Sequence, residues 1–343
     1  PDGETRRLTT KNIVIASGAS PTIPDIQGLE NINYQTSDTL WQHLLKTETL
    51  PKKMAVLGGG PIGCELAQAF ARLGCDVCMI VRGNRLLPKE DLAVAEFIAD
   101  KFEKEGIRIF TNSEIQECTE STIVLKREAK EETLACDMLL VAVGRTARTK
   151  GFGLEELGIE ANITIQTNEY LETLYPNIYA VGDVAGPYQF THVAAHQAWY
   201  AAVNALFGKF KRFKVDYRVI PWVTFVDPQI ARVGLSEDEA REKGIDVEVT
   251  QYDIKELDRA IAESANEGFV KVVTPPGKDK ILGVTIVSEN AGEMLSEFVL
   301  AMKHGLGLNK ILGTIHVYPT WAEANKYAAG EWKKKHAPEK ILR

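Results

Sequence analysis

The pattern of apolar and polar positions defines one complete unit that starts near residue 53. The run 54–57 is short and wholly apolar, which predicts a β-strand. After a turn with three glycines, apolar residues recur at helical spacing until Gly74, a residue type that often follows a helix end. The helical positions are Ile62, Leu66, Ala69, Phe70 and Leu73. A second apolar run at 77–81 completes a predicted strand–helix–strand unit.

The same kind of pattern continues to residue 146. It predicts a helix near 92–105, a strand at 107–110, a hairpin around 115–132 and a strand at 138–143. Strands that alternate with helices are typical of a parallel sheet with helices on its faces. We therefore expect an α/β fold with a doubly wound nucleotide-binding subdomain.

The first 50 residues predict less structure of their own. Residues 11–16 are apolar and β-branched, which is typical of a strand buried on both faces, and Gly18 breaks this run. Such a strand needs two neighbours, but the stretch that follows predicts a helix capped by Ser37 or Asp38 and then a linker around Pro51. The chain is therefore expected to begin inside a domain.

Gly58, Gly60 and Gly63 have the spacing of a dinucleotide-binding fingerprint. Such glycines alone are a weak signal, and a bare tight turn is the alternative. Here the turn follows a strand and opens an amphipathic helix, which is the context that the fingerprint requires. Gly58 permits the turn, Gly60 lets the backbone approach a pyrophosphate, and Gly63 lets helix and strand pack closely. The helix N-terminus adds partial positive charge, so we expect a bound dinucleotide.

The end of the second strand indicates which dinucleotide binds. An NAD site usually has an acid there, about 20 residues after the glycines, which accepts hydrogen bonds from the ribose 2′-OH. This sequence instead has Arg82 and Arg85. Guanidinium groups bind a 2′-phosphate through charge-assisted hydrogen bonds. We expect a preference for NADPH, with NADH as the other candidate, and two solvated arginines as the alternative interpretation.

Composition adds exclusions. A net charge of −7 over 343 residues argues against broad nucleic-acid binding. The longest apolar runs fall far short of the roughly 20 residues of a membrane span, and no signal peptide opens the chain, so a soluble cytoplasmic protein is expected. The five cysteines form no regular framework, which predicts reduced thiols. Cys75 and Cys78 lie too far apart along an extended strand to form a disulfide.

Three stretches resemble motifs of the pyridine nucleotide-disulfide oxidoreductases. LETLYPNIYAVGDVAG is similar to the second flavin motif, in which a Gly-Asp pair at a strand end holds the ribityl chain of FAD; Gly182 and Asp183 match that pair. IASGASPTIP, with Ser17 and Gly18, resembles the link from the flavin domain to the nucleotide domain. VAVGRTA, with Gly144, resembles the return link. The resemblance implies FAD as a second cofactor.

A helix of small residues is predicted at 191–207, after the flavin motif. The resemblance places His192 and Val193 near the flavin. His192 and His196 are also four residues apart on one helix face, as in a metal-binding pair, but no third ligand is evident nearby. Packing near the flavin is the favoured interpretation, and no metal site is expected.

The last third resembles the interface domain of the branch with dihydrolipoamide dehydrogenase, glutathione reductase and mercuric reductase. The similarity extends from PWVTFVDPQIARVGLSEDEA to IHVYPTWAE. It implies a homodimer formed by residues from about 216 onward. A helical stripe in this region equally suits an interface or a core, and consists of Met294, Leu295, Phe298, Val299 and Met302. The expected domains are an incomplete FAD-binding domain (1–50 and 147–215), an NAD(P)-binding domain (51–146) and an α+β interface domain (216–343).

The resemblance also implies an activity. In the family, a first glycine fingerprint and a redox-active cysteine pair precede the segment with which this chain begins, so the chain is expected to lack most of an N-terminal flavin lobe. The implied enzyme passes a hydride from a nicotinamide to FAD and electrons on to a small-molecule or metal-ion acceptor. Glu65 fills the position of an acid near the nicotinamide, or else caps the first helical turn. A nucleotide-binding or dimerisation module without catalysis is the alternative function.

The segment IHVYPTWAE bears on the acceptor. Related disulfide reductases have a histidine just before the proline, as the acid–base partner of the redox thiols, and a glutamate five residues later. Glu323 matches the glutamate, Tyr318 occupies the histidine position, and His316 lies two residues earlier, roughly 7 Å away on the same face of a strand. With a pKa of about 10, a tyrosine is a poor base at neutral pH. We expect an acceptor that needs little proton shuttling, such as a quinone, a metal ion or oxygen. With Thr320, Glu323 also fits a helix capping box.

Overall fold

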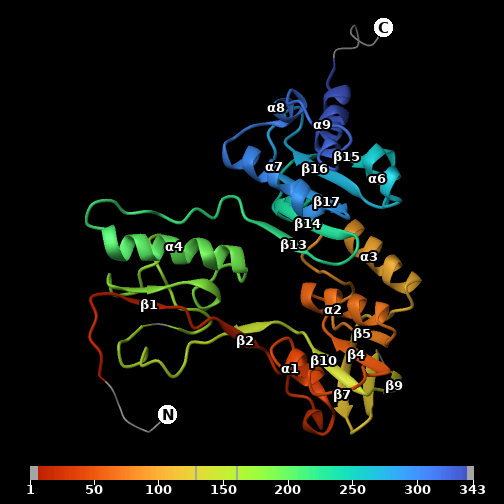
Figure 1. Ribbon diagram of the computed structural model, residues 1–343, viewed down its shortest axis with the longest axis vertical. Coiled ribbons are helices and arrows are strands. Elements are labelled where there is room, and N and C mark those ends of the chain that lie inside the picture. Colours follow the sequence, from red (N-terminus) through yellow and green to blue (C-terminus); the bar gives the residue numbers. More distant parts are fainter. Residues whose placement is uncertain (1–6, 128–129, 160, 338–343) are drawn as a thin grey trace. The chain divides into compact units, whose positions relative to one another are not determined.

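The computed structural model describes residues 7–127, 130–159 and 161–337. The chain divides into two compact units (Figure 1). One unit comprises Pro1–Thr22 and Arg145–Tyr217, and the other comprises Ile23–Gly144 and Arg218–Arg343.

A five-stranded parallel sheet forms the centre of the first half of the larger unit. Successive residues of its middle strands point to opposite faces of the sheet. Met54 and Met79 pack in one apolar cluster, and their neighbours Ala55 and Ile80 pack in another. A parallel strand buried on both faces needs apolar side chains at every position, which explains the continuous apolar runs. The strand order is β3 (Tyr34–Thr36), β10 (Met138–Val141), β4 (Lys53–Leu57), β5 (Asp76–Ile80) and β6 (Arg108–Phe110), with all neighbours parallel.

Each face of this sheet has its own cover. Helices α2 (Pro61–Arg72) and α3 (Leu92–Lys104) supply Phe70 and Phe102 to one apolar cluster. An antiparallel sheet supplies Ile123 and other residues to the cluster on the other face. This sheet consists of β7 (Ser113–Cys118), β8 (Thr122–Arg127) and β9 (Lys130–Ala135), so the predicted hairpin is part of a three-stranded sheet. The prediction of an α/β nucleotide-binding fold is confirmed.

The helix predicted to start at Ser37 or Asp38 is shorter than expected. Helix α1 covers only Leu40–Leu44, and its N-cap is Thr39, without a side-chain cap. The prediction of the cap is wrong because residues 36–39 form a turn, in which the Thr39 N–H donates to the Thr36 carbonyl. The helix can begin only after this turn.

The five cysteines are all free and buried. Cys78 points into the cluster beneath the antiparallel sheet, whereas Cys75 belongs to the cluster with α2 and α3. The two thiols therefore lie on different faces of the parallel sheet, which agrees with the prediction that they form no disulfide.

The second half of the larger unit is built on an antiparallel sheet. Its order is β13 (Pro221–Thr224), β14 (Gln229–Gly234), β17 (Gly283–Ser288), β16 (Phe269–Thr274) and β15 (Glu248–Asp253). Around it lie α5 (Glu237–Glu242), α6 (Asp258–Glu263), α7 (Ala291–Lys303), α8 (Leu308–Leu312) and α9 (Glu323–Lys335) (Figure 1). The apolar stripe of α7 packs in the core with this sheet and α9, so it is a core feature.

The smaller unit holds two strand pairs and one long helix. Strand β1 (Ile13–Ile15) is parallel to β12 (Ile178–Ala180), and β2 (Ala19–Pro21) is antiparallel to β11 (Arg145–Ala147). Helix α4 covers Thr191–Phe207, as predicted.

Strand β1 does not have the burial expected from its sequence. Ile13 is 46% exposed and Val14 is 45% exposed. The expectation of burial on both faces is wrong for the described residues, because β12 is the one strand among them that pairs with β1. The described residues include no helix that is both long and apolar enough to span a membrane.

Candidate functional site

The glycine turn between β4 and α2 forms a cradle of backbone atoms. Gly58 has a φ of 117°, and a Cβ at this position would lie 2.3 Å from the Ala142 carbonyl oxygen. A Cβ on Gly63 would lie 2.3 Å from the Gly58 carbonyl oxygen, so any side chain would push the helix off the turn. A Cβ on Gly60 would meet no atom within 4 Å. The turn is thus packed against protein backbone at Gly58 and Gly63, whereas the space next to Gly60 is open.

This cradle fits the pyrophosphate of a dinucleotide. Gly60 is the N-cap of the twelve-residue helix α2, and no side chain caps that helix. The N–H groups of a first helical turn have no intrahelical acceptor, and they carry the positive end of the helix dipole. An anion above Gly60 therefore meets open space and unsatisfied donors.

The two candidate arginines after β5 have different surroundings. The side chain of Arg82 is exposed, and it has no hydrogen bond or ion pair within the described part of the chain. Arg85 donates to the Pro88 carbonyl at 3.2 Å and lies 3.7 Å from an oxygen of Asp238. Arg82 is available to a ligand, whereas Arg85 already has protein partners.

Glu65 contacts a distant segment rather than its own helix. Its Oε1 accepts the N–H of Phe225 at 2.7 Å, and no side chain caps α2, so the capping interpretation is wrong. Burial raises the pKa of the Glu65 carboxyl, and the hydrogen bond from Phe225 opposes this rise. The carboxyl lies half-buried on the helix that the glycine turn begins.

Two further side chains of α2 hold the same segment, and sequence reasoning missed them. Gln68 makes two hydrogen bonds with the backbone of Asp227, at 2.7 and 2.8 Å. Arg72 pairs with the Asp227 carboxylate at 2.6 Å. With Glu65 these residues form a polar stripe at spacings of three and four on an otherwise apolar helix. That spacing is the signal that could have identified them.

The candidate flavin residues lie in the smaller unit. Gly182 is buried with a φ of 75°, and its N–H donates to Gln197 Oε1 at 2.6 Å. The same Gln197 is fully buried and donates to the Gly186 carbonyl, which orders the turn after β12. Asp183 is half-buried in this turn, and its carboxylate has no partner in the described ranges. A carboxylate at a strand end with free acceptor atoms fits the hydroxyl groups of a ribityl chain.

The other two candidate flavin residues, His192 and Val193, lie at the start of helix α4 and differ in exposure. Val193 is buried, whereas His192 is exposed and stacks on Phe190 with ring centroids 5.2 Å apart. His196 lies against the ring of Tyr200. Across residues 7–127, 130–159 and 161–337, no group of three or more His, Cys, Asp or Glu side chains is placed to hold a metal ion.

The link residues adopt backbone conformations that favour glycine. Gly18 has a φ of 69°, and its carbonyl accepts the N–H of Arg148 at 2.9 Å. Ser17 Oγ donates to the Arg148 carbonyl at 2.8 Å. Gly144 has a φ of 121° and directly precedes β11. Both links therefore turn at the predicted glycines.

His316 and Tyr318 do not share a face. Residues 314–319 form no strand, so the strand assumption for this segment is wrong. The His316 side chain is only 6% exposed, with Nε2 2.9 Å from Glu297 and Nδ1 3.0 Å from the Thr314 carbonyl. Tyr318 is 65% exposed, and its hydroxyl donates to Asp258 at 3.0 Å. That hydrogen bond raises the pKa of Tyr318.

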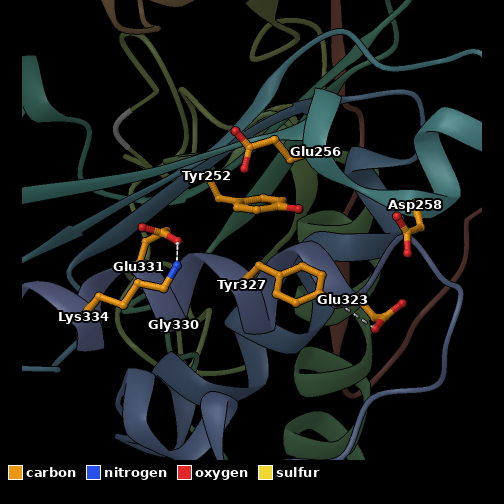
Figure 2. Close-up of a pocket in the computed structure, with 8 residues that line it drawn as sticks. All are labelled: Tyr252, Glu256, Asp258, Glu323, Tyr327, Gly330, Glu331 and Lys334. Carbon is orange, nitrogen blue, oxygen red and sulfur yellow. Dashed lines mark hydrogen bonds and ion pairs between the residues drawn. The ribbon is translucent and has the colours of Figure 1, made fainter. Parts of the chain in front are cut away.

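Glu323 is buried at the start of α9. Its carboxylate accepts the Thr320 N–H at 3.2 Å and the Tyr327 hydroxyl at 3.3 Å. The Thr320 hydroxyl donates to the Val317 carbonyl instead of capping the helix, so only half of the predicted capping box forms. Figure 2 shows Glu323, Tyr327 and Asp258 on the wall of one cavity of about 280 Å³. Tyr318 bonds to Asp258 at this cavity.

Comparison with known proteins assigns both parts of the chain. The family model described as "Pyridine nucleotide-disulphide oxidoreductase" matches residues 1–198, and its dimerisation-domain model matches residues 220–329. A mercuric reductase of Staphylococcus aureus is 36% identical over 330 residues, which cover 94% of this chain and 59% of that protein. A dihydrolipoyl dehydrogenase of Chlamydia pneumoniae is 34% identical over 93% of this chain and 69% of its own length.

Solved structures agree with this assignment. The HOCl-induced flavoprotein disulfide reductase RclA from Escherichia coli has a TM-score of 0.84 and 29% identity, over 93% of this chain and 73% of that one. The chain thus spans about 59% of the length of the mercuric reductase that it matches.

Proposed function

The chain belongs to the pyridine nucleotide-disulphide oxidoreductase family, and we propose that it functions in an FAD-dependent NAD(P)H oxidoreductase, as the part of the enzyme whose residues bind and orient the cofactors. The observation that supports this best is the cradle above Gly60, which is closed by Gly58 and Gly63 and faces the uncapped end of α2. FAD, when bound, supplies the ring that accepts a hydride from a nicotinamide and releases electrons to a second substrate. The residues of this chain bind and orient the two cofactors.

For the nicotinamide cofactor, the proposal assigns NADPH. The exposed guanidinium of Arg82 is available for the 2′-phosphate, and no acid lies at the end of β5 to accept a ribose hydroxyl. Arg85 supports the same loop through Asp238 and Pro88. Glu65 would lie at the nicotinamide end, where its carboxyl, with a raised pKa, orients the ring or holds a proton.

For FAD, the proposal assigns the turn after β12. Asp183 offers free carboxylate oxygens to the ribityl hydroxyls, and Gly182 brings the backbone close, held by Gln197. His192 and Val193 follow on α4, at the end of that helix nearest the turn in sequence. Ser17, Gly18 and Gly144 belong to the two links.

The domain division stays a proposal: FAD binding by 1–50 and 147–215, NAD(P) binding by 51–146, and the interface by 216–343. Strand β3 lies before residue 50, yet it pairs with β10 of the nucleotide sheet. A homodimer is supported by the match of residues 220–329 to the dimerisation domain. We propose a cytoplasmic location, which suits five free and buried thiols.

For the acceptor, the proposal favours a molecule that needs little proton transfer, such as a quinone, a metal ion or oxygen. Tyr318 holds its proton more firmly than a free tyrosine, because it donates to Asp258. Both nitrogens of His316 have protein partners, and its side chain is buried. Neither residue is therefore placed to serve as a base at neutral pH.

The test is a spectrum and an assay of the intact, full-length protein after purification. A flavin absorbance that bleaches on addition of NADPH, and a steady oxidation of NADPH with a quinone acceptor, are the expected results. A colourless protein that binds NADPH but does not oxidise it would contradict the enzyme. It would then support the nucleotide-binding module.

A further inference from the structure

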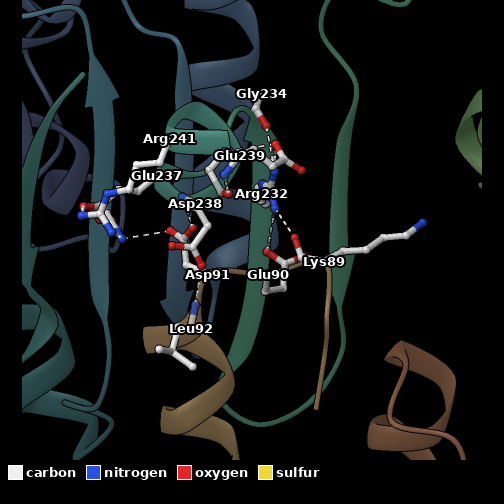
Figure 3. A network of polar contacts seen from close by, with 12 residues as sticks. Lys89, Glu90, Asp91, Leu92, Arg232, Gly234, Glu237, Asp238, Glu239 and Arg241 are labelled. Atoms are coloured by element: carbon white, nitrogen blue, oxygen red, sulfur yellow. Dashed lines mark hydrogen bonds and ion pairs between the residues drawn. The ribbon is translucent and has the colours of Figure 1, made fainter. Parts of the chain in front are cut away.

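Arg232 is a charged residue with a fully buried side chain in the middle of β14. Figure 3 shows its guanidinium between the carboxylates of Glu90 and Glu239. Glu90 lies 3.5 Å away and is itself 4% exposed. The guanidinium also donates to the carbonyl of Lys89. A buried charge is stable only if it is paired, so Arg232 and the backbone at Lys89 and Glu90 hold each other in place.

An aromatic side chain closes this cluster. The Trp222 ring lies 4.8 Å from the Arg232 guanidinium carbon, and its Nε1 donates to Glu90 Oε1 at 2.8 Å. Burial raises the pKa of Glu90, while the charge of Arg232 and the hydrogen bond from Trp222 lower it. Burial is the largest of these influences, so the pKa of Glu90 lies above its ordinary value although both neighbours favour the ionised form.

A series of backbone hydrogen bonds connects Glu90 to the glycine turn. The N–H of Glu90 donates to the Leu87 carbonyl at 2.8 Å, and the N–H of Leu87 donates to the Gly59 carbonyl at 2.7 Å. Gly59 is the middle residue between Gly58 and Gly60 of the dinucleotide cradle. Two backbone hydrogen bonds thus connect the Arg232 cluster to the backbone that would face the pyrophosphate.

Leu87 is strained in this position. Its φ is 46°, in the left-handed region that a branched side chain rarely adopts. Its side chain is 2% exposed, and both its N–H and its carbonyl are hydrogen-bonded. Such a conformation persists only where the surroundings enforce it. Arg232 donates to the carbonyl of Lys89, two residues further along the same backbone.

We propose that Arg232 is a positioning residue for the dinucleotide: through Lys89, Glu90 and Leu87 it fixes the loop that carries Arg82 against Gly59. The inference rests on the proposed binding of NADPH at this turn. On this proposal Arg232, which lies within the match to the dimerisation domain and has a fully buried side chain, influences the affinity for the nucleotide.

The experiment measures dissociation constants of NADPH and of 2′,5′-ADP for the chain and its variants by calorimetry. Arg232→Met keeps the bulk of the side chain and removes its charge; we expect about tenfold weaker binding of both ligands. Arg232→Lys restores the charge and is expected to recover part of the affinity. Trp222→Phe removes the indole donor and part of the ring area but keeps an aromatic side chain, and is expected to weaken binding about threefold.

Two controls separate positioning from stability. Lys101→Met removes another ion pair between the same two halves of the unit, with Glu267 at 2.6 Å, far along α3 from the loop. It is expected to leave both dissociation constants within about twofold. If Arg232→Met does not fold, the double variant Arg232→Met, Glu90→Gln removes the unpaired buried carboxylate and is measured in its place. Circular dichroism reports the folded fraction of each variant.

The outcomes are distinct. Folded Arg232 and Trp222 variants that bind NADPH as tightly as the unsubstituted chain would overturn the positioning role and leave the proposed function intact. An equal loss of affinity in Lys101→Met would show that any broken contact between the halves has the same effect, and would also overturn it. An unsubstituted chain that binds neither NADPH nor NADH would overturn both the proposed function and this inference.

Discussion

Asp91 and Asp238 exchange hydrogen bonds between the first turns of helices α3 and α5. Asp91 Oδ1 accepts the N–H of Asp238 in the first turn of α5, at 3.1 Å, and Asp238 Oδ2 accepts the N–H of Leu92 at the start of α3, at 3.0 Å. The residues are separated by 147 positions, so this exchange ties the nucleotide sheet to the antiparallel sheet of the same unit. Lys271 adds a buried ion pair to Asp91 at 2.9 Å.

This pairing predicts a pH dependence of stability. Burial of Asp91 alone would raise its pKa, but hydrogen bonds from Lys271 and from the Asp238 N–H outweigh burial and hold the pKa below its ordinary value. Ionised Asp91 therefore stabilises the fold fully above the unfolded-state pKa of about 3.9, and this contribution is lost as pH falls through the folded-state pKa. In urea unfolding, Asp91→Asn is expected to be less stable at pH 7 by about 2 kcal/mol. The difference should shrink below about pH 4; a constant difference from pH 7 to pH 3 would contradict the assignment.

Arg82→Ala is expected to weaken NADPH binding by about tenfold or more and to leave NADH binding unchanged, because only the 2′-phosphate loses a charge-assisted partner. Arg85→Ala is the matched variant. Its guanidinium already contacts Asp238 and Pro88, so a smaller effect on NADPH is expected. Calorimetric titration with both nucleotides decides. Tighter binding of NADH to the unsubstituted chain, or a larger loss in Arg85→Ala, would refute this assignment.

Glu65→Gln separates stability from catalysis. The amide oxygen of Gln can still accept the Phe225 N–H, and the substitution removes a carboxylate whose pKa burial raises. An acid with a raised folded-state pKa costs stability as pH rises above its unfolded-state value of about 4.3, so the variant should equal or exceed the parent in stability at pH 7.

Stopped-flow reduction of the flavin by NADPH is the second measurement on Glu65→Gln. We expect a slowing of about tenfold or more if the carboxylate acts on the nicotinamide. Glu96→Gln, an exposed position on α3, is the control and should leave the rate unchanged. A normal rate in Glu65→Gln would assign this residue to structure alone.

The segment before α9 predicts poor disulfide reduction. Tyr318→Phe removes one exposed hydrogen bond to Asp258 and is expected to change quinone turnover by less than about twofold. His316→Ala removes a side chain that is 6% exposed together with its hydrogen bond to the partly exposed Glu297, and is expected to lower the free energy of unfolding by about 1–2 kcal/mol. Steady-state assays of the intact, full-length protein with lipoamide, glutathione disulfide and a quinone test both variants. Efficient disulfide turnover that survives Tyr318→Phe but disappears in a folded His316→Ala would show that His316 is the acid–base group after all.

The match to a dimerisation domain predicts a dimer in solution. Light scattering at micromolar concentration is expected to give twice the chain mass of 38.0 kDa. The stripe of α7 is buried in its own core, so Phe298→Ala should lower the free energy of unfolding by about 3–5 kcal/mol through cavity formation. A monomer mass for the unsubstituted protein would count against the dimer.

The sequence by itself determined the elements whose hydrogen bonds and faces repeat within a few residues. The apolar runs of β4 and β5, the helical spacing of α2 and the bounds of α4 all follow from such local periodicity. Gly63 was predictable for the same reason, because a Cβ there would meet the carbonyl of Gly58 in the same turn. The close approach of Gly58 is to Ala142, so the glycine spacing predicted this residue but the local pattern did not identify its neighbour.

Only the tertiary structure decided which distant groups meet. Glu65 contacts Phe225, 160 positions away, and Arg232 contacts Lys89, 143 positions away. The different surroundings of His316 and Tyr318 likewise depend on their hydrogen-bond partners Glu297 and Asp258, which lie on α7 and α6. Local pattern specifies a face to be buried but not the partner that covers it, since the partner depends on how the whole unit packs.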